Sequence, residues 1–155
     1  MDLSPFSQQT YSCRCEWGLV GIDALVPADV TIVVDILSFT TTVDVAVSNG
    51  VAVLPYRWKD PSAEFFARAQ GAELAGPRGS ARFSLSPSSF RGAEPGTRCV
   101  LPSPNGAAMT LHAAASNSVI LAGSLRNAVA TATAARELGT TFNVIPAGER
   151  WSDGS

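Results

Sequence analysis

Histidine, charge of either sign and long apolar runs are all scarce in this chain of 155 residues. Charged residues make up only 15%, with 11 basic against 13 acidic side chains and a formal net charge of −2. Without a basic cluster, nucleic-acid binding has no electrostatic support. No apolar run approaches the roughly 20 residues of a membrane-spanning helix. The N-terminal segment also lacks the basic and apolar regions of a signal peptide. We therefore expect a cytoplasmic protein that binds neither nucleic acid nor membrane.

The scarcity of cysteine and histidine excludes several kinds of site. Cys13, Cys15 and Cys99 form an odd set without a zinc-ligand spacing, so we expect reduced thiols. His112 is the single histidine and lies in an Ala-rich helical segment, where a packing or surface role is expected. A serine-hydrolase triad would need this residue as its base, so that chemistry is disfavoured.

Short apolar runs rich in β-branched residues are the main pattern that the chain does contain. They cover residues 31–35, 51–54, 98–101, 118–122 and 142–145, and helical patterns follow the first four. Strands that alternate with helices at this spacing indicate βαβ units. The sequence therefore predicts an α/β fold, a three-layer α/β/α arrangement around a mostly parallel sheet.

Two segments depart from this alternation. Residues 76–96 are rich in Ser, Pro, Gly and Arg and are expected to form a long loop, a kind of segment that is often functional. The chain ends at Ser155, where a helix after the fifth strand should begin. We expect residues 1–155 to form a single α/β domain that lacks the C-terminal portion of a longer protein.

Polar residues follow the predicted strands, at the sheet edge where open α/β sheets bind ligands. Asp35 ends a buried run, and a carboxylate there needs a partner, a hydrogen bond or a metal ion. It is a candidate Mg²⁺ ligand or nucleophile, with a cap or turn role as the alternative. Thr40, Thr41 and Thr42 begin the next helix and suit either an anion site or ordinary capping.

Two later turns carry further candidates for substrate binding. Ser103, Asn105 and Gly106 lie between the third strand and its helix, where an amide could hold a phosphate oxygen and glycine permits close approach. A simple turn would use the same residues. Arg126 is a candidate clamp for phosphate or sulfonate, and Asn127 is both a candidate substrate ligand and an N-cap.

The last strand is followed by Glu149 and Arg150, with Asp153 close by. Glu149 is a second carboxylate at the edge where Asp35 lies. Two convergent carboxylates with an arginine nearby suit Mg²⁺ and an anionic substrate. We therefore expect Asp35 and Glu149 to bind the metal, and both of them, with Arg150, to be catalytic.

Four segments together resemble one family. Residues 33–42, Val-Val-Asp-Ile-Leu-Ser-Phe-Thr-Thr-Thr, are similar to the Asp-Val-Leu-Arg/Ser-x-Thr/Ser-Thr-Thr signature of the 2-phosphosulfolactate phosphatases. Residues 101–106, 125–128 and 145–150 are similar to three further segments of that family, in the same order. The resemblance implies an unusual α/β fold and Mg²⁺-dependent hydrolysis of 2-phospho-3-sulfolactate to 3-sulfolactate and phosphate. In methanogens this step belongs to coenzyme M biosynthesis.

The chain departs from the family at two points. Family members are longer, and their C-terminal portion contains further acidic residues. Ser38 stands where many members have arginine, which leaves the identity of the substrate open. Besides 2-phospho-3-sulfolactate, the alternatives are another small phosphorylated acid or a non-catalytic anion-binding fragment. Homo-oligomerisation through Ala-rich helices or an uncovered sheet edge also stays open.

The expected mechanism rests on charge stabilisation and positioning, which carry most of phosphoryl-transfer catalysis. Helix N-termini at Thr41 and Asn105 would bind phosphate oxygens, and Arg126 or Arg150 would hold the carboxylate or sulfonate. Direct attack by water and an acyl phosphate on Asp35 both remain open. The Asp-x-Asp pattern of haloacid dehalogenases is absent, since Leu37 occupies its second acidic position, and this favours water.

Overall fold

The strands of this chain form two parallel sheets. In the computed structural model, which describes residues 4–148, the first sheet has the order β1-β7-β2-β6 and the second the order β3-β5-β4. Every strand pair in both sheets is parallel. The prediction of an α/β fold with parallel strands is confirmed, but the strands are divided between two sheets where one was expected.

The elements follow one another in regular alternation. The strands are β1 (Cys13–Cys15), β2 (Val30–Val34), β3 (Ala52–Tyr56), β4 (Glu73–Leu74), β5 (Arg98–Pro102), β6 (Val119–Gly123) and β7 (Phe142–Pro146). The α-helices are α1 (Gly18–Ala24), α2 (Phe39–Ser48), α3 (Ser62–Ala69), α4 (Gly106–Ala113) and α5 (Ala128–Leu138). Two short 3₁₀ helices are η1 (Pro5–Ser7) and η2 (Pro87–Phe90).

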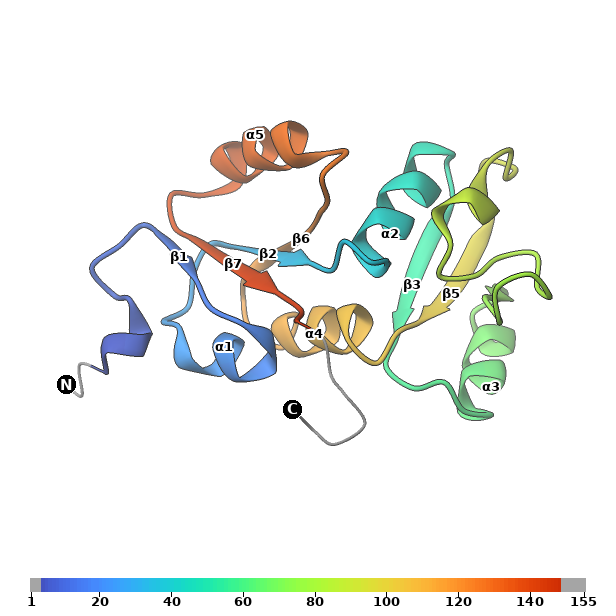
Figure 1. Cartoon of the computed structure of the whole chain (residues 1–155), viewed down its shortest axis with the longest axis horizontal. Coiled ribbons are helices and arrows are strands. Elements are labelled where there is room, and N and C mark those ends of the chain that lie inside the picture. Colours follow the sequence, from blue (N-terminus) through green and yellow to red (C-terminus); the bar gives the residue numbers. More distant parts are fainter. Residues whose placement is uncertain (1–3, 149–155) are drawn as a thin grey trace.

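Helices α2 and α4 connect the two sheets. The chain leaves the first sheet at β2, passes through α2 and enters the second sheet at β3; it returns from β5 through α4 to β6. Figure 1 shows both helices between the two groups of strands. Since each helix starts at the carboxyl end of a strand, this crossing brings two helix N-termini from different sheets toward one region.

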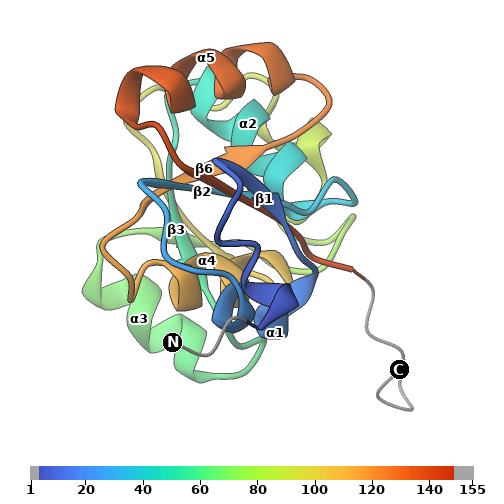
Figure 2. The same ribbon diagram turned by 90° about the vertical axis from the view of Figure 1, so that its left-hand side faces the viewer.

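Helices cover the first sheet on both faces. In Figure 2, α5 and α2 lie on one side of the β1-β7-β2-β6 sheet, and α1 and α4 lie on the other. This gives the first sheet the expected α/β/α layering. None of the helices among the described residues is long and apolar enough to cross a membrane.

Each sheet has its own apolar cluster. Under the first sheet, Val33 and Ile145 pack with Leu25 and Met109. Beside the second sheet, a larger cluster includes Phe39 of α2 together with Phe83, Phe90, Cys99 and Leu101. Phe83 and Phe90 stack with ring centroids 4.6 Å apart, and both are almost fully buried. These rings attach the long loop at residues 76–96 to α2.

The five predicted strands and the four predicted helices all occur, with ends that differ from the expected ones by a few residues. Residues 76–96 are mostly irregular, as expected, apart from η2 and a bridge between Gly76 and Ser84. The sequence patterns missed β1, α1 and the short β4.

Candidate functional site

Asp35 lies at the carboxyl end of β2 and links the N-termini of α2 and α4. Its Oδ2 accepts a hydrogen bond of 2.9 Å from the backbone N–H of Gly106, the first residue of α4. Its backbone N–H donates to Thr40 Oγ1 at 3.0 Å, and its carbonyl accepts from the Thr40 N–H at 2.8 Å. The structure thus brings Asp35, Thr40 and Gly106 together at one turn.

The threonine hydroxyls of α2 bond to the turn that precedes the helix. Thr41 Oγ1 donates to the carbonyl of Ile36 at 2.8 Å, and Thr42 Oγ1 donates to that of Ser38 at 2.7 Å. Thr40 and Thr42 are fully buried, while Thr41 is half-buried. Thr40 and Thr42 therefore shape the turn. Contact of these two side chains with a substrate stays a prediction that their inward direction does not favour.

The N-terminus of α4 contains the second set of predicted residues. Ser103 is 4% exposed, and its backbone N–H donates to the carbonyl of Tyr56 on the neighbouring strand. Asn105 is the N-cap residue, is half-buried, and its side chain makes no hydrogen bond to another described residue. The Asn105 amide is therefore available to a ligand at this helix terminus.

Gly106 must be glycine at this position. A Cβ there would lie 2.5 Å from Asp35 Oδ2 and closer still to the ring of Phe39. Close approach of the α4 backbone to the Asp35 carboxylate is thus possible only without a side chain. Neither N-cap residue, Ser38 of α2 or Asn105 of α4, caps its own helix with its side chain; at α4 it is the Asp35 carboxylate that accepts the first N–H, where the helix N-terminus favours negative charge.

The long loop brings an arginine to this region that the sequence analysis did not single out. Arg78 Nη2 donates to Ser38 Oγ at 2.9 Å and to the carbonyl of Leu85 at 2.9 Å. Ser38 Oγ in turn donates to the same Leu85 carbonyl at 2.5 Å. Ser38 immediately precedes α2, so Arg78 lies at that helix N-terminus. Only the length and composition of residues 76–96 hinted at a role.

Arg126 and Asn127 lie at the turn between β6 and α5, and their polar atoms bond within the protein. Arg126 Nε donates to Asp44 Oδ2 on α2 at 2.7 Å. Asn127 Oδ1 accepts from Ser124 N at 2.7 Å, and its Nδ2 donates to the Ala122 carbonyl at 2.9 Å. Both residues thus stabilise their own surroundings, and substrate contact by either stays a prediction.

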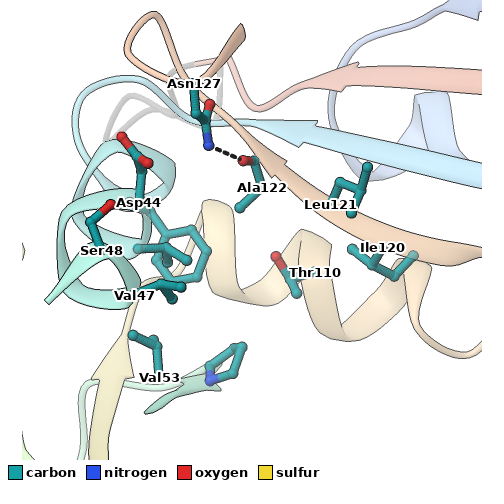
Figure 3. Close-up of a pocket in the computed structure, with 12 residues that line it drawn as sticks. Asp44, Val47, Ser48, Val53, Thr110, Ile120, Leu121, Ala122 and Asn127 are labelled. Atoms are coloured by element: carbon teal, nitrogen blue, oxygen red, sulfur yellow. Dashed lines mark hydrogen bonds between the residues drawn. The ribbon is translucent and has the colours of Figure 1, made fainter. Parts of the chain in front are cut away.

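A cavity of about 530 Å³ lies between the edges of the two sheets, bordered by α2, β3, α4 and β6. Figure 3 shows its mainly apolar walls, with Val47, Val53, Ile120 and Leu121 around the space and Asp44 and Asn127 at one end. Asp35 does not line it. Walls of this kind do not suit a small polyanion, so we place the candidate phosphate site at the Asp35 turn.

Only one residue of the predicted metal site, Asp35, lies within the described residues. Glu149 and Arg150 lie outside the described residues. Within residues 4–148, no group of three or more histidine, cysteine and acidic side chains could hold a metal ion. Asp35 supplies the described carboxylate of the predicted pair.

His112 and the three cysteines were the other residues that composition raised as candidates for a site. The Nε2 atom of His112 on α4 lies 2.7 Å from Asp23 Oδ1 on α1, so this pair joins the two helices under the first sheet. Cys13 and Cys15 are exposed free thiols, and Cys99 is a buried one.

Comparison of the sequence with known proteins gives a family match. No curated protein matches the sequence at a significant level. The family model of 2-phosphosulpholactate phosphatase matches residues 22–153. This range contains β2, α2, α4, the Asp35 turn and the loop that includes Arg78. The match covers most of the 155 residues, and the chain therefore belongs to the 2-phosphosulpholactate phosphatase family.

Proposed function

We propose that this protein is a Mg²⁺-dependent phosphatase that hydrolyses 2-phospho-3-sulfolactate to 3-sulfolactate and phosphate. The family name indicates a hydrolase of phosphoric monoesters, and so a small phosphorylated substrate. The observation that carries the proposal is the bond between Asp35 Oδ2 and the Gly106 N–H, which joins two helix N-termini at one carboxylate.

The two helix N-termini are the binding site that we propose for the phosphate. Backbone N–H groups at a helix N-terminus and the helix dipole both favour an anion. The half-buried Asn105 amide lies at the start of α4 and would donate to a phosphate oxygen. Donors fixed in this way stabilise charge without reorganisation during the reaction, which is the main need of phosphoryl transfer.

Asp35 fits a role as a Mg²⁺ ligand. Mg²⁺ prefers oxygen ligands and is commonly bound by one or two carboxylates plus waters and substrate phosphate. The absence of a larger acidic cluster within residues 4–148 therefore does not conflict with such a site. Asp35, with Glu149 as the proposed second carboxylate, would hold the ion. Bound there, Mg²⁺ would neutralise phosphate charge.

The chain's own residues would position the substrate. The α2 turn, held by the Thr40 and Thr42 hydroxyls, keeps Asp35 in place. The hydrogen bond from Gly106 leaves the carboxylate facing the start of α4. Arg150, with Arg126 as the alternative, is proposed to hold a second anionic group of the substrate. The choice between water and Asp35 as nucleophile belongs to this proposal, as do the coenzyme M pathway and the cytoplasmic location.

The test is phosphate release from 2-phospho-3-sulfolactate by the purified chain, with Mg²⁺ and then with a chelator. We expect turnover that chelation abolishes and that Asp35→Asn lowers by at least about a hundredfold. Asp23→Asn, the same change at an exposed carboxylate on α1, is the matched control and should leave turnover unchanged. A folded chain without turnover on this substrate would reject the proposal.

A second candidate is hydrolysis of another small phosphorylated acid. Ser38 favours it, because many members of the family have arginine at this position. A panel containing 2-phospholactate and 2-phosphoglycolate separates the two candidates. A higher kcat/KM for either compound than for 2-phospho-3-sulfolactate would identify the different substrate.

A further inference from the structure

Arg78 is held at the N-terminus of α2 by bonds that use only one of its nitrogen atoms. Nη2 donates to Ser38 Oγ and to the Leu85 carbonyl, both at 2.9 Å. A guanidinium has five N–H donors. The three on Nε and Nη1 make no hydrogen bond to the described residues, so they can bind a ligand while Nη2 keeps the group in place.

The charge of Arg78 is also unbalanced. Arg82, in the same loop, pairs with Glu73 at 2.7 Å, and Arg126 at the β6–α5 turn pairs with Asp44 at 2.7 Å. Within residues 4–148, no acidic side chain lies within 4.0 Å of the Arg78 guanidinium. A fixed cation without an acidic partner at a helix N-terminus attracts an oxyanion, and a planar guanidinium can bind carboxylate or sulfonate oxygens in pairs.

The contact with Ser38 places this cation next to the candidate phosphate site. Ser38 lies three positions after Asp35, and its carbonyl accepts two hydrogen bonds from Thr42, one from the hydroxyl and one from the backbone N–H. The turn from Asp35 to Ser38 is therefore fixed at both ends. Ser38 thus offers a small hydroxyl group that accepts a hydrogen bond from an arginine of the long loop.

We propose that Arg78 determines substrate specificity by binding the second oxyanion of the substrate, its carboxylate or sulfonate, beside the phosphate. This inference rests on the proposed function, since it places the phosphate at the Asp35 turn. Ser38 and the Leu85 carbonyl act as positioning groups for the guanidinium. Because 2-phospho-3-sulfolactate has both a carboxylate and a sulfonate, Arg78 takes one of these groups, and Arg150, or Arg126 as the alternative, would hold the other.

The decisive measurement is the affinity of 3-sulfolactate, which cannot be hydrolysed, for the wild-type chain and for Arg78→Ala by titration calorimetry. We expect the dissociation constant to rise about ten- to a hundredfold in the variant, as for the loss of a charged hydrogen-bonding partner. Arg68→Ala on α3, whose partner is the exposed Glu64, removes the same charge elsewhere and should leave the affinity unchanged. Equal affinity in wild type and Arg78→Ala, or no binding to either, overturns the inference.

Arg78→Lys keeps the proposal testable if the alanine variant does not fold. Lysine retains the charge but cannot donate to Ser38, Leu85 and a ligand at once. We expect a smaller rise in the dissociation constant than for alanine. Wild-type affinity in a folded Arg78→Lys variant, together with an unchanged KM, would argue that the guanidinium binds no ligand.

Kinetics distinguish the two possible oxyanions and separate this inference from the proposed function. With 2-phospho-3-sulfolactate, we expect Arg78→Ala to raise KM more than it lowers kcat, since binding is lost in ground and transition states alike. A similar rise with 2-phospholactate identifies the carboxylate as the bound group; a rise only with the sulfonate compound identifies the sulfonate. If the wild type releases no phosphate, the proposed function fails, while the 3-sulfolactate titration still decides the role of Arg78.

Discussion

The backbone N–H of Gly106 donates to Asp35 Oδ2 at 2.9 Å, although the two residues are 71 positions apart in the sequence. This bond joins β2 of the first sheet to the helix that leaves the second sheet. Two strand-to-helix turns that belong to different sheets thus become one site. The hydrogen bond between Gly106 and Asp35 therefore contributes both to the placement of the two sheets and to the geometry of the site.

Gly106→Ala should damage both the fold and the site. The added Cβ would meet Asp35 Oδ2 and the Phe39 ring, and the ring cannot withdraw without disturbing the buried cluster to which it belongs. Overpacking of this kind costs about 1–3 kcal/mol of unfolding free energy. Urea denaturation followed by circular dichroism measures the change.

Gly71→Ala is the matched control for this substitution. Its added Cβ would meet nothing within 4 Å, but the residue has φ of 57°. Only this left-handed backbone conformation therefore disfavours a side chain there. We expect a loss of about 1 kcal/mol from that conformation. If Gly106→Ala were no more destabilising than Gly71→Ala, the close approach of α4 to Asp35 would be wrong.

The hydrogen bonds of Asp29 predict a pH-dependent contribution to stability. The carboxylate accepts from the backbone N–H groups of Thr140 and Thr141 and then from their hydroxyls, and these bonds lower the pKa of Asp29 from 3.8 to about 2. A lowered pKa in the folded state stabilises the fold above the unfolded value. This stabilisation should be complete above about pH 4 and be lost as the pH falls toward 2.

Asp29→Asn isolates the charge, because the amide oxygen still accepts hydrogen bonds. Urea denaturation of wild type and variant between pH 7 and pH 2 should give a constant difference down to about pH 4 and a shrinking one below it. A difference that is the same at pH 2.5 as at pH 7 would show that the Asp29 charge has no stabilising role. Gly139 lies beside this carboxylate and leaves no room for a side chain, so position 139 should not be varied as a control.

Local patterns along the chain were sufficient to predict most elements, and the reason for each failure is physical. Apolar runs ending in turns located β2, β3, β5, β6 and β7 because these strands are long and largely apolar. β1 was missed because its buried central residue is Arg14, which bonds to Asn143 and to the carbonyls of Gln8 and Val26. A buried arginine whose hydrogen-bond partners lie outside its own strand leaves no sequence pattern that predicts a strand.

In the candidate site, too, the residues at strand ends could be predicted from local patterns, whereas a contact between distant segments could not. Placing Asp35, Asn105 and Gly106 at strand ends required only local patterns and the rule that ligands bind at this sheet edge. The approach of Arg78 to Ser38 spans 40 positions and depends on how the long loop packs through Phe83 and Phe90. The division into two sheets could not be predicted either, because strand order is set by which apolar faces meet.

The pair between Arg126 and Asp44 should contribute more than an ordinary surface ion pair. The Asp44 side chain is only 11% exposed, so removal of Arg126 leaves a carboxylate with little access to water. We expect Arg126→Ala to destabilise the fold by about 1–2 kcal/mol, above the roughly 0–1 kcal/mol of exposed pairs. The exposed pair Arg68–Glu64 on α3 is the comparison, and Arg68→Ala should change stability by less than about 0.5 kcal/mol.

A double-mutant cycle with Asp44→Asn separates pairing from substrate binding. If Arg126 serves mainly the pair, its removal should be almost neutral once the Asp44 charge is gone, and KM for the phosphorylated substrate should change little. A several-fold rise in KM for Arg126→Ala, with unchanged stability, would instead support the substrate clamp that the sequence predicts.

The three thiols should differ sharply in reactivity. Cys13 and Cys15 are exposed, whereas Cys99 is fully buried in the apolar cluster beside the second sheet. Burial, with a smaller contribution from the Glu73 carboxylate, raises the pKa of the Cys99 thiol to about 12. Because the thiolate is the reactive form, Cys99 should be inert toward a disulfide reagent at pH 8 while the chain is folded.

We expect two thiols per chain to react quickly with the reagent, and the third only as denaturant opens the second sheet. In a Cys13→Ser, Cys15→Ser variant the fast phase should disappear entirely. The remaining slow rate, measured against urea concentration, then reports the free energy of the opening that exposes Cys99. Rapid labelling of that variant under native conditions would mean that the cluster of Phe39, Phe90 and Leu101 does not seal the second sheet, and the anchoring of the Arg78 loop would have to be reconsidered with it.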